Sequence, residues 1–569
     1  MAQVDHLDRL AAEKIPKVEM SLAEFEEKEA FRLRLEGILR QAILEGYSGV
    51  FATISLVAFG SLASGFGMPG SDMDLAIVLE WKDPSQADEI GIDRGIPRLL
   101  ERAVLDSKMG GRLLTRTRVP ILKVCESPTE ALYTALLEER KKWDKLPENE
   151  QYPTDAPAEP SPLPKPLVDI DGQKSAEVVQ HSISPVIGDD FPELGTAPQK
   201  KKRAALKAST NVQLTDTVSP TTPVESASNK NSATSPPNKQ QHHQQHHHHH
   251  RADKAWVREK ILGPLDFPKQ GVGIQCDINF DNPLGIHNTR MLRCYSLTDP
   301  RVRPIVLFVK AWAKRRKINS SYAGTLSSYG WVLMVLHYLV NIAHPPVCPN
   351  LQHTIPQPKD LGQLESFFKD PTVSGYTVRF WRNEQEIIQA AQSGRLSQNR
   401  QTVGALLRGF FQYYASLFVY GNNYGPRPPQ FYWTNEVLSL RTPGGIRTKQ
   451  DKGWVSAKTT VTAEKKVTNR YLFAIEDPFE LDHNVARTVT HRGIVAIRDD
   501  FRRAWRILSA IGRGMEPEGG IFDEVVENPL PPTPKEETKE ELKTMGMEDV
   551  GINDGEDGLQ ETNEAIVGL

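Results

Sequence analysis

The alternation of apolar and polar positions divides the first part of the chain into helices and strands. Residues 21–45 carry apolar side chains at helical spacing, and Ser21 with Glu24 forms the capping-box pattern that begins a helix. Two apolar runs flanking a segment of small residues predict a strand, a short helix and a second strand over 52–80. A helix is expected over 88–106, followed by strands over 112–118 and 119–124.

The pattern is lost over residues 127–251 and returns after them. Apart from a helical piece at 128–143, this stretch is rich in Pro, Ser, Thr, Lys and Gln, so it cannot bury enough apolar surface to fold. Beyond it, residues 273–280 alternate like a half-buried strand with Asp277 at the centre. Helices are then expected at 288–295, 304–316, 327–341, 384–392, 403–418, 476–489 and 499–511. The aromatic side chains of the 403–418 helix indicate core packing rather than base stacking.

The amino-acid composition indicates the cellular compartment and the distribution of charge along the chain. The chain of 569 residues is 39% hydrophobic and 25% charged, values typical of soluble globular proteins with two or three domains. Its four cysteines form no Cys-x-x-Cys pair, which indicates a reducing compartment and neither a disulfide framework nor a zinc site. No apolar run is long enough to span a membrane, and the first 20 residues lack a signal-peptide pattern. The net charge is −3, but eleven Asp/Glu against three Lys from Asn528 onward leave the rest of the chain basic, as in a binder of phosphates.

The strongest chemical signal is Gly60-Ser61 followed by Asp72-Met73-Asp74 at the start of an apolar run. Strand periodicity places both aspartates on one face, where their like charges call for a cation between them. Mg2+ binds such hard oxygen ligands together with substrate phosphates. A hairpin with two solvated aspartates is the alternative for a lone Asp-x-Asp; the coincidence of spacing, glycine turn and apolar flanks favours a metal site. Asp277 on its own strand needs a partner, which is either a salt bridge or the same metal site.

At these residues the chain resembles the nucleotidyltransferase superfamily typified by DNA polymerase β, with its Gly-Ser and Asp-x-Asp signature. Three further stretches, 277–289, 309–330 and 475–487, narrow the resemblance to the cytoplasmic terminal uridylyltransferase and poly(A) polymerase family. It covers roughly residues 30–126 and 272–511.

The resemblance implies an α+β fold in which a small mixed-sheet catalytic domain faces a helical central domain across a cleft. The implied organisation is a disordered N-terminus at 1–20, an N-terminal helix of the central domain at 21–47, the catalytic domain at 48–126 and 271–286, a mostly disordered insertion at 127–270, the central domain at 287–515 and an acidic disordered tail at 528–569.

The resemblance also implies the roles of the acidic and basic residues. Asp72, Asp74 and Asp277 would hold two Mg2+ ions, with Mn2+ as a substitute. The Gly60 backbone and the Ser61 side chain would bind the terminal phosphates. Lys310 and Lys314, four residues apart on one helix face, would clamp the triphosphate.

Base and sugar recognition follow from the same comparison. Ser328 and Tyr329 match the position where an aromatic ring stacks on the incoming base. Asn288 and Thr289 match residues that contact the ribose 2′-hydroxyl. Asp477 would accept from uracil N3–H, directly or through water, and an imidazole N–H of His483 would donate to uracil O4 and oppose the adenine amino group. For His483 alone, a role in capping or packing a helix start stays open.

The function that these features predict is template-independent addition of UMP from UTP to RNA 3′ ends, with release of pyrophosphate. A poly(A) polymerase using ATP is the nearest alternative, and an inactive RNA-binding scaffold the next. The expected partners are UTP and an RNA 3′ end held by basic residues such as Arg315, Arg316 and Lys317, with Arg116 and Arg118 as further candidates. A monomer without membrane association is expected, in the cytoplasm or alternatively the nucleus.

Overall fold

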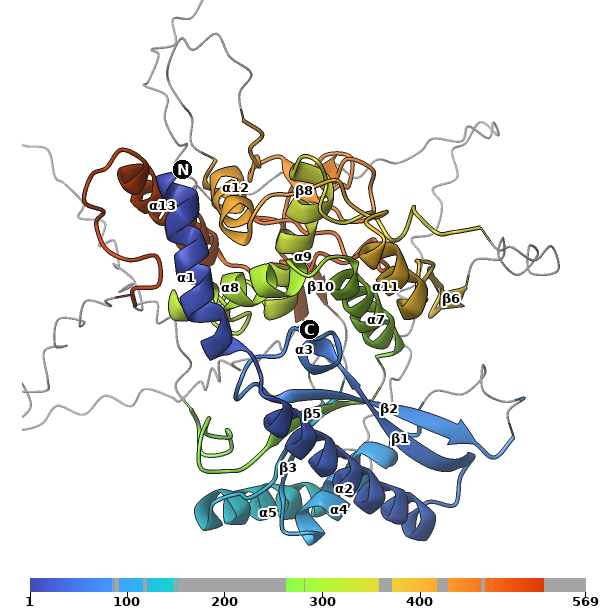
Figure 1. Cartoon of the computed structure of the whole chain (residues 1–569). Helices are drawn as coiled ribbons and strands as arrows, with labels where there is room; N and C mark the ends of the chain where they lie inside the picture. The colour runs from blue at the N-terminus through green and yellow to red at the C-terminus, as the bar shows by residue number, and fades with distance from the viewer. Residues whose placement is uncertain are drawn as a thin grey trace, which may run out of the picture. The chain divides into compact units, whose positions relative to one another are not determined.

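The computed structural model describes residues 1–83, 85, 92–115, 120–147, 151, 262–280, 282–357, 371–416, 428–461 and 466–525 (Figure 1). The chain divides into two compact units, Met1–Asp155 with Lys254–Leu569, and Ala156–Asp253. The second unit, which makes up most of the predicted insertion, lies outside the described residues, as do the acidic tail and the side chains of Arg116 and Arg118. Every described element belongs to the first unit.

A mixed five-stranded sheet has the strand order β1-β2-β5-β4-β3. The strands are β1 (Phe51–Phe59), β2 (Met73–Trp81), β3 (Gly110–Leu114), β4 (Ile121–Cys125) and β5 (Gln275–Asn279). β2 and β5 pair in parallel, and the other neighbours pair antiparallel. The last strand in sequence therefore inserts between β2 and β4, which confirms the prediction that residues on both sides of the insertion build one sheet.

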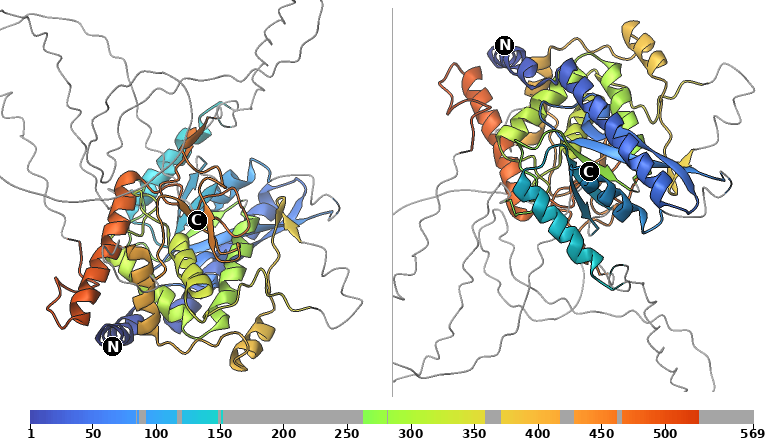
Figure 2. Two further views of the ribbon diagram at one scale, coloured as in Figure 1. Left: turned by 90° about the horizontal axis from the view of Figure 1, so that it is seen from above. Right: turned by 90° about the horizontal axis from the view of Figure 1, so that it is seen from below.

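Two helices, α2 (Leu22–Gly46) and α4 (Ile96–Asp106), share a core with the strands. Helix α2 begins as predicted, with the Glu24 amide donating to Ser21 Oγ at 3.1 Å. Its buried positions recur every four residues from Phe31 to Ile43 and pack against β1 and α4. The assignment of residues 21–47 to the helical domain is therefore wrong: this helix belongs to the sheet. Seen from below, α2 and α5 (Glu130–Asp144) lie in front of the strands (Figure 2).

The prediction of a disordered N-terminus is also wrong. Residues Ala2–Val18 form helix α1, which packs against the helical part of the unit and buries Leu7 and Ala11 there (Figure 1). The Asp8 carboxylate accepts from the Gly404 amide at 2.6 Å and from the Thr402 hydroxyl at 2.7 Å. Asp8 thus caps a helix almost 400 residues away. The weak apolar pattern of α1 is compensated by this long-range contact, which sequence periodicity does not reveal.

The helical part surrounds a large apolar core. Its other helices are α7 (Pro283–Thr298), α8 (Val302–Arg315), α9 (Ser328–His337) continuing into the π-helical turn Tyr338–Ile342, α11 (Glu384–Gln392), α12 (Val403–Ala415) and α13 (His491–Gly512). Short hairpins complete it: β6 (Thr372–Val373) with β7 (Tyr376–Thr377), β8 (Glu436–Leu438) with β9 (Ile446–Thr448), and β10 (Lys458–Val461) with β11 (Lys466–Asn469). The aromatic residues of α12 are buried in this core, as predicted, with Phe411 5.0 Å from Trp312 between ring centroids.

One expected helix is absent. Residues 476–489 form a loop rather than a helix, with Glu476 bridged to Asn484 in antiparallel fashion. The Asn484 side chain explains this, because its oxygen accepts from the amides of Ile475 and Ala486 while its Nδ2 donates to two carbonyls. A buried amide that satisfies four backbone groups fixes a loop that apolar spacing alone does not predict.

Candidate active site

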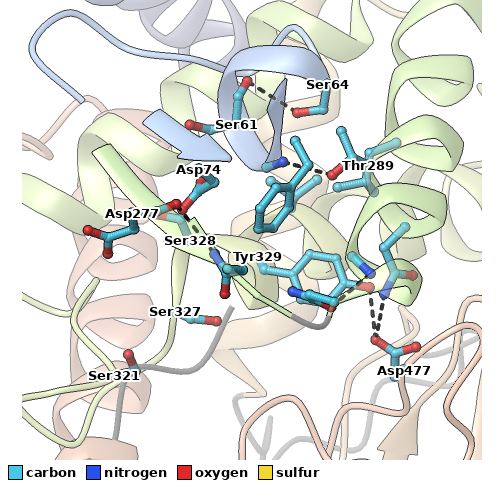
Figure 3. A pocket seen from close by; sticks show the side chains of 18 of the residues that line it. Ser61, Ser64, Asp74, Asp277, Thr289, Ser321, Ser327, Ser328, Tyr329 and Asp477 are labelled. Atoms are coloured by element: carbon cyan, nitrogen blue, oxygen red, sulfur yellow. Dashed lines mark hydrogen bonds between the residues drawn. The ribbon is translucent and has the colours of Figure 1, made fainter. Parts of the chain in front are cut away.

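A cavity of about 390 Å³ lies between the sheet and the helical part, and most of the predicted site residues line it (Figure 3). The lining includes Gly60, Ser61, Asp74, Asp277, Asn288, Thr289, Lys310, Ser328, Tyr329, Asp477 and His483. Asp72 and Lys314 are not among the lining residues. We call the part around Asp74 and Asp277 the acidic end and the part around Tyr329, Asn288 and Asp477 the Asp477 end.

The acidic end is built by the parallel pairing of β2 with β5. Asp74 and Asp277 are direct partners in the register, so both side chains leave the sheet on the same face. Burial, reinforced by the negative charges of Asp277 and Asp72, raises the pKa of Asp74 to about 7. The pKa of Asp72 is also raised, by burial and by Asp277. The three carboxylates therefore interact although Asp277 comes 200 residues after the other two.

A lysine that the sequence analysis missed accompanies these carboxylates. Lys123 on β4 pairs with Asp277 in the antiparallel register, and its ammonium donates to both carboxylate oxygens at 2.7 and 2.9 Å. Burial opposes the charge of Lys123, but the attraction and hydrogen bonds of Asp277, together with the charges of Asp72 and Asp74, raise the lysine pKa. Of the two alternatives weighed for Asp277, the salt bridge is present, and the side chain also lies beside Asp74; its place in a metal site stays a prediction. The signal for Lys123 was only its alternation within a predicted strand.

Gly60 is required where β1 turns into the short helix α3 (Gly60–Ala63). Its φ is +67°, and a Cβ at this position would lie 2.2 Å from an Asp74 carboxylate oxygen. Its amide donates to Thr289 Oγ1 at 2.8 Å. Thr289 therefore ties the turn to helix α7, in addition to lying on the cavity wall.

The two predicted clamp lysines differ. Lys310 is 4% exposed, and its ammonium donates to the Phe66 carbonyl at 2.7 Å. Burial lowers its pKa to about 8, although Asp74 opposes this shift. Lys314 lies one turn further along α8 with an exposed side chain outside the lining, and its charge acts on Asp72. Lys310 thus lines the cavity, and Lys314 does not.

At the Asp477 end the polar groups hold one another. Asp477 Oδ2 accepts from the Tyr329 hydroxyl at 3.0 Å and from Asn288 Nδ2 at 3.3 Å (Figure 3). Its Oδ1 accepts from the amides of Phe479 and Glu480, both at 2.9 Å. Burial raises the pKa of Asp477, and these hydrogen bonds counteract the shift. Asp477 thereby fixes the ring that was predicted to stack on the base.

His483 lies on the same cavity wall as Asp477, together with Glu480 and Arg487, which the sequence analysis did not single out. Asp477, Glu480, His483 and Arg487 follow one another at intervals of three, three and four residues, the spacing of a helix face, although a loop carries them. Among the basic residues proposed to hold RNA, Arg316 is in fact buried at 8% exposure and pairs with Asp500 at 2.7 Å. A charged run can include a core ion pair, which composition alone does not show.

No three His, Cys, Asp or Glu side chains in the described ranges converge into a ready-made metal site. The donor set nonetheless fits Mg2+, because the acidic end offers hard carboxylate oxygens and Mg2+ takes its remaining ligands from water and phosphates. The raised pKa of Asp74 marks the excess of negative charge that such an ion would relieve. No helix among the described residues has the length and apolar character needed to span a membrane.

The fold and the cavity define a nucleotidyltransferase-type site, and comparisons with known proteins agree. Residues 402–483 match the family model of Cid1 family poly(A) polymerases, and residues 7–133 and 240–297 match that of the central palm domain of mitochondrial-like poly(A) RNA polymerases. The terminal uridylyltransferase cid1 of Schizosaccharomyces pombe is 42% identical over 272 residues, covering 48% of this chain and 58% of that protein. The poly(A) RNA polymerase GLD2 of Rattus norvegicus is 32% identical over 238 residues, covering 41% of this chain and 39% of that protein.

Among solved structures, one of Cid1, described in terms of its RNA terminal uridylyl transferase activity, matches with a TM-score of 0.55 and 26% identity over 92% of this chain and 100% of that one. In sequence and in fold the chain is thus similar to the Cid1 family of terminal uridylyltransferases and poly(A) polymerases. In sequence, the matched region spans 58% or less of these two curated relatives.

Proposed function

We propose that the protein adds UMP from UTP to RNA 3′ ends without a template. The observation that carries this proposal is that one cavity joins the paired carboxylates Asp74 and Asp277 to the Asp477 end with His483. A nucleoside triphosphate has a matching arrangement, with a charged phosphate chain at one end and a hydrogen-bonding base at the other.

At the acidic end, Asp72, Asp74 and Asp277 would hold Mg2+, which supplies charge neutralisation for the triphosphate and the leaving pyrophosphate. Lys310 and the start of α3 at Ser61 add positive potential for the phosphates. The 3′-hydroxyl oxygen of the RNA forms a bond to the α-phosphorus and gives up its proton to water. The bond between the α-phosphorus and the oxygen that bridges to the β-phosphate breaks, and pyrophosphate leaves. Lys123 balances the charge of Asp277 whenever no other cation does so.

At the other end, the ring of Tyr329 stacks on the base and the hydroxyl of Tyr329 stays on Asp477. Because Asp477 already accepts four hydrogen bonds, it reads uracil N3–H through water. His483 donates to uracil O4 and disfavours the adenine amino group. The names of relatives support this assignment: one is a terminal uridylyltransferase, and solved Cid1 structures include one in complex with a UTP analogue.

Polyadenylation is the second candidate, because the GLD2 relatives are poly(A) RNA polymerases. One structure of the Cid1 poly(U) polymerase, solved to reveal the mechanism of UTP selectivity, is of a histidine-to-asparagine mutant bound to MgATP. This supports testing the base preference of the present chain at His483. We also infer a cytoplasmic location, since one structural relative is described as a cytoplasmic RNA terminal U-transferase.

The test is single-turnover incorporation of each of the four NTPs on an oligo(A) primer. We expect UTP to be preferred. The variant His483→Asn should shift the UTP-to-ATP ratio towards ATP by a factor of about ten or more, because one unsatisfied hydrogen bond at the base edge costs about that much in affinity. His491→Asn, an exposed histidine at the start of α13, is the matched control. A clear preference of the wild-type protein for ATP would contradict the proposal, and an unchanged ratio in His483→Asn would remove the role of that side chain.

A further inference from the structure

The loop that carries Asp477, Glu480 and His483 is closed at its base. Glu476 and Asn484 flank it as an isolated antiparallel bridge, and the Asp477 amide donates to the His483 carbonyl at 3.2 Å. Glu476 also continues a parallel contact with β8, because its amide donates to the Leu438 carbonyl at 2.9 Å. The base of the loop is therefore fixed from two sides, whereas its middle depends on other contacts.

A single ammonium group ties the middle of this loop to its base. Lys452 Nζ donates to the Leu481 carbonyl at 2.6 Å and to Glu476 Oε1 at 2.8 Å. Leu481 precedes His483 by two residues, so this bond sets the backbone that presents the imidazole. The Lys452 side chain is 7% exposed and does not line the cavity. It therefore lies behind the loop and not beside the nucleotide.

Several contacts fix the position of the Lys452 side chain. Glu476, at 1% exposure, receives a hydrogen bond from Ser439 Oγ at 2.5 Å and has Arg447 at 3.5 Å, so its carboxylate is held in one place. The ammonium also lies 4.7 Å from the ring centroid of Trp454. A buried charge pair is weak evidence for stability, but it specifies geometry where several partners meet. The hydrogen bond from Lys452 to the Leu481 carbonyl does not help to neutralise Glu476. Its effect is therefore on the position of the loop.

We propose that Lys452 is a positioning residue for base selectivity: it holds the loop so that His483 meets the base edge, without touching the nucleotide. This inference rests on the proposed function, in which the loop reads the base. It assigns part of the selectivity to the turn that follows β9, a segment that contributes no lining residue to the cavity. Hydrogen-bond selectivity requires donor placement within a few tenths of an ångström, which a tethered loop supplies and an untethered one does not.

The test compares the UTP-to-ATP ratio of kcat/KM in wild type, Lys452→Met/Glu476→Gln and Lys458→Met. The double variant removes both charges, so that no buried charge is left alone, and Lys458 is an exposed lysine six positions away. We expect the ratio to fall about tenfold in the double variant, mainly through a higher KM for UTP, with no change in Lys458→Met. Dissociation constants for UTP and ATP, measured in parallel, give the same ratio independently of RNA extension.

An unchanged ratio in a double variant that melts like the wild type would overturn the inference. If the double variant does not fold, the variant Lys452→Arg provides the test. It keeps the positive charge beside Glu476 but replaces the compact ammonium donor with a planar guanidinium. We expect the UTP-to-ATP ratio to fall about threefold, and an unchanged ratio would overturn the inference. A preference of the wild type for ATP would contradict the proposed function but not the inference about Lys452. In that case, loss of the ATP preference in the double variant would still support the positioning role of Lys452. Equal use and equal binding of UTP and ATP by the wild type would overturn both.

Discussion

The two ends of the cavity hold their carboxylates in different ways. At the acidic end, Asp74 lies beside Asp277 and Asp72, and burial with these like charges raises its pKa to about 7. At the Asp477 end, one buried carboxylate accepts four hydrogen bonds, from Tyr329, Asn288 and two backbone amides. The first arrangement leaves negative charge unbalanced, and the second satisfies its polar groups within the protein.

This difference indicates that the two ends have opposite effects on the stability of the folded protein without a ligand. The raised pKa values of Asp72 and Asp74 mean that their negative charges destabilise the folded protein in the absence of a cation, whereas Asp277 is paired with Lys123. This excess of buried negative charge indicates a ligand. Asp477 stabilises its surroundings before any ligand binds, and presents Tyr329 in a fixed orientation. Removing Asp74 should therefore lower activity without a loss of stability, whereas removing Asp477 should lower both activity and stability.

The largest effect is expected at the acidic end. Asp74→Asn should lower single-turnover incorporation on the order of 10³-fold, because the charge that holds Mg2+ is lost. The free energy of unfolding, measured with urea in the absence of divalent ions, should stay equal or rise. Asp106→Asn, an exposed aspartate at the end of α4, should change neither quantity. A clear loss of stability in Asp74→Asn would show that this carboxylate is structural.

A second effect is expected in the stability of the Asp477 end. Asp477→Ala leaves the donors of Tyr329, Asn288 and two amides without their acceptor, so the free energy of unfolding should fall by about 3 kcal/mol. Incorporation of UTP should fall as well, since the ring of Tyr329 loses its anchor. Asp482→Ala, an exposed aspartate in the same loop, is the control. Equal unfolding curves for Asp477→Ala and wild type would contradict the contrast between the two ends.

A smaller effect concerns the support of the Asp477 end in acid. His337, at the far end of α9 from Tyr329, is fully buried with Nε2 3.2 Å from the Tyr413 hydroxyl, and burial lowers its pKa from 6.5 to about 4. Its neutral form is thus favoured in the folded state, so the stabilisation is complete above pH 6.5 and is lost as the pH falls towards 4. We expect a loss of about 3 kcal/mol across this range.

His337→Gln keeps a polar partner for Tyr413 and does not titrate. Urea unfolding curves at several pH values should therefore lose this part of their pH dependence in the variant. An identical pH dependence in both proteins would exclude His337 as its source.

The parts of the fold that were predicted correctly are those with local signals. The apolar runs around Gly60 and Asp74, the Ser21 cap of α2 and the aromatic face of α12 each follow from spacing within one element. The wrong assignments depend on distant partners. Helix α1 is stabilised by docking and by the bond from Gly404 to Asp8, and the 476–489 loop is fixed by the side chain of Asn484.

For the site, the sequence by itself predicted the kind of chemistry from the paired aspartates after a Gly-Ser turn, and the resemblance to a known family added Asp477 and His483 far downstream. The tertiary structure decided which groups meet. It placed Asp277 beside Asp74 through a parallel register, gave Asp277 the ammonium of Lys123, and set Lys452 behind the loop that bears His483. The physical reason is that carboxylate charge and hydrogen-bond capacity belong to the residue, whereas burial, pairing and pKa depend on neighbours that only the folded chain brings together.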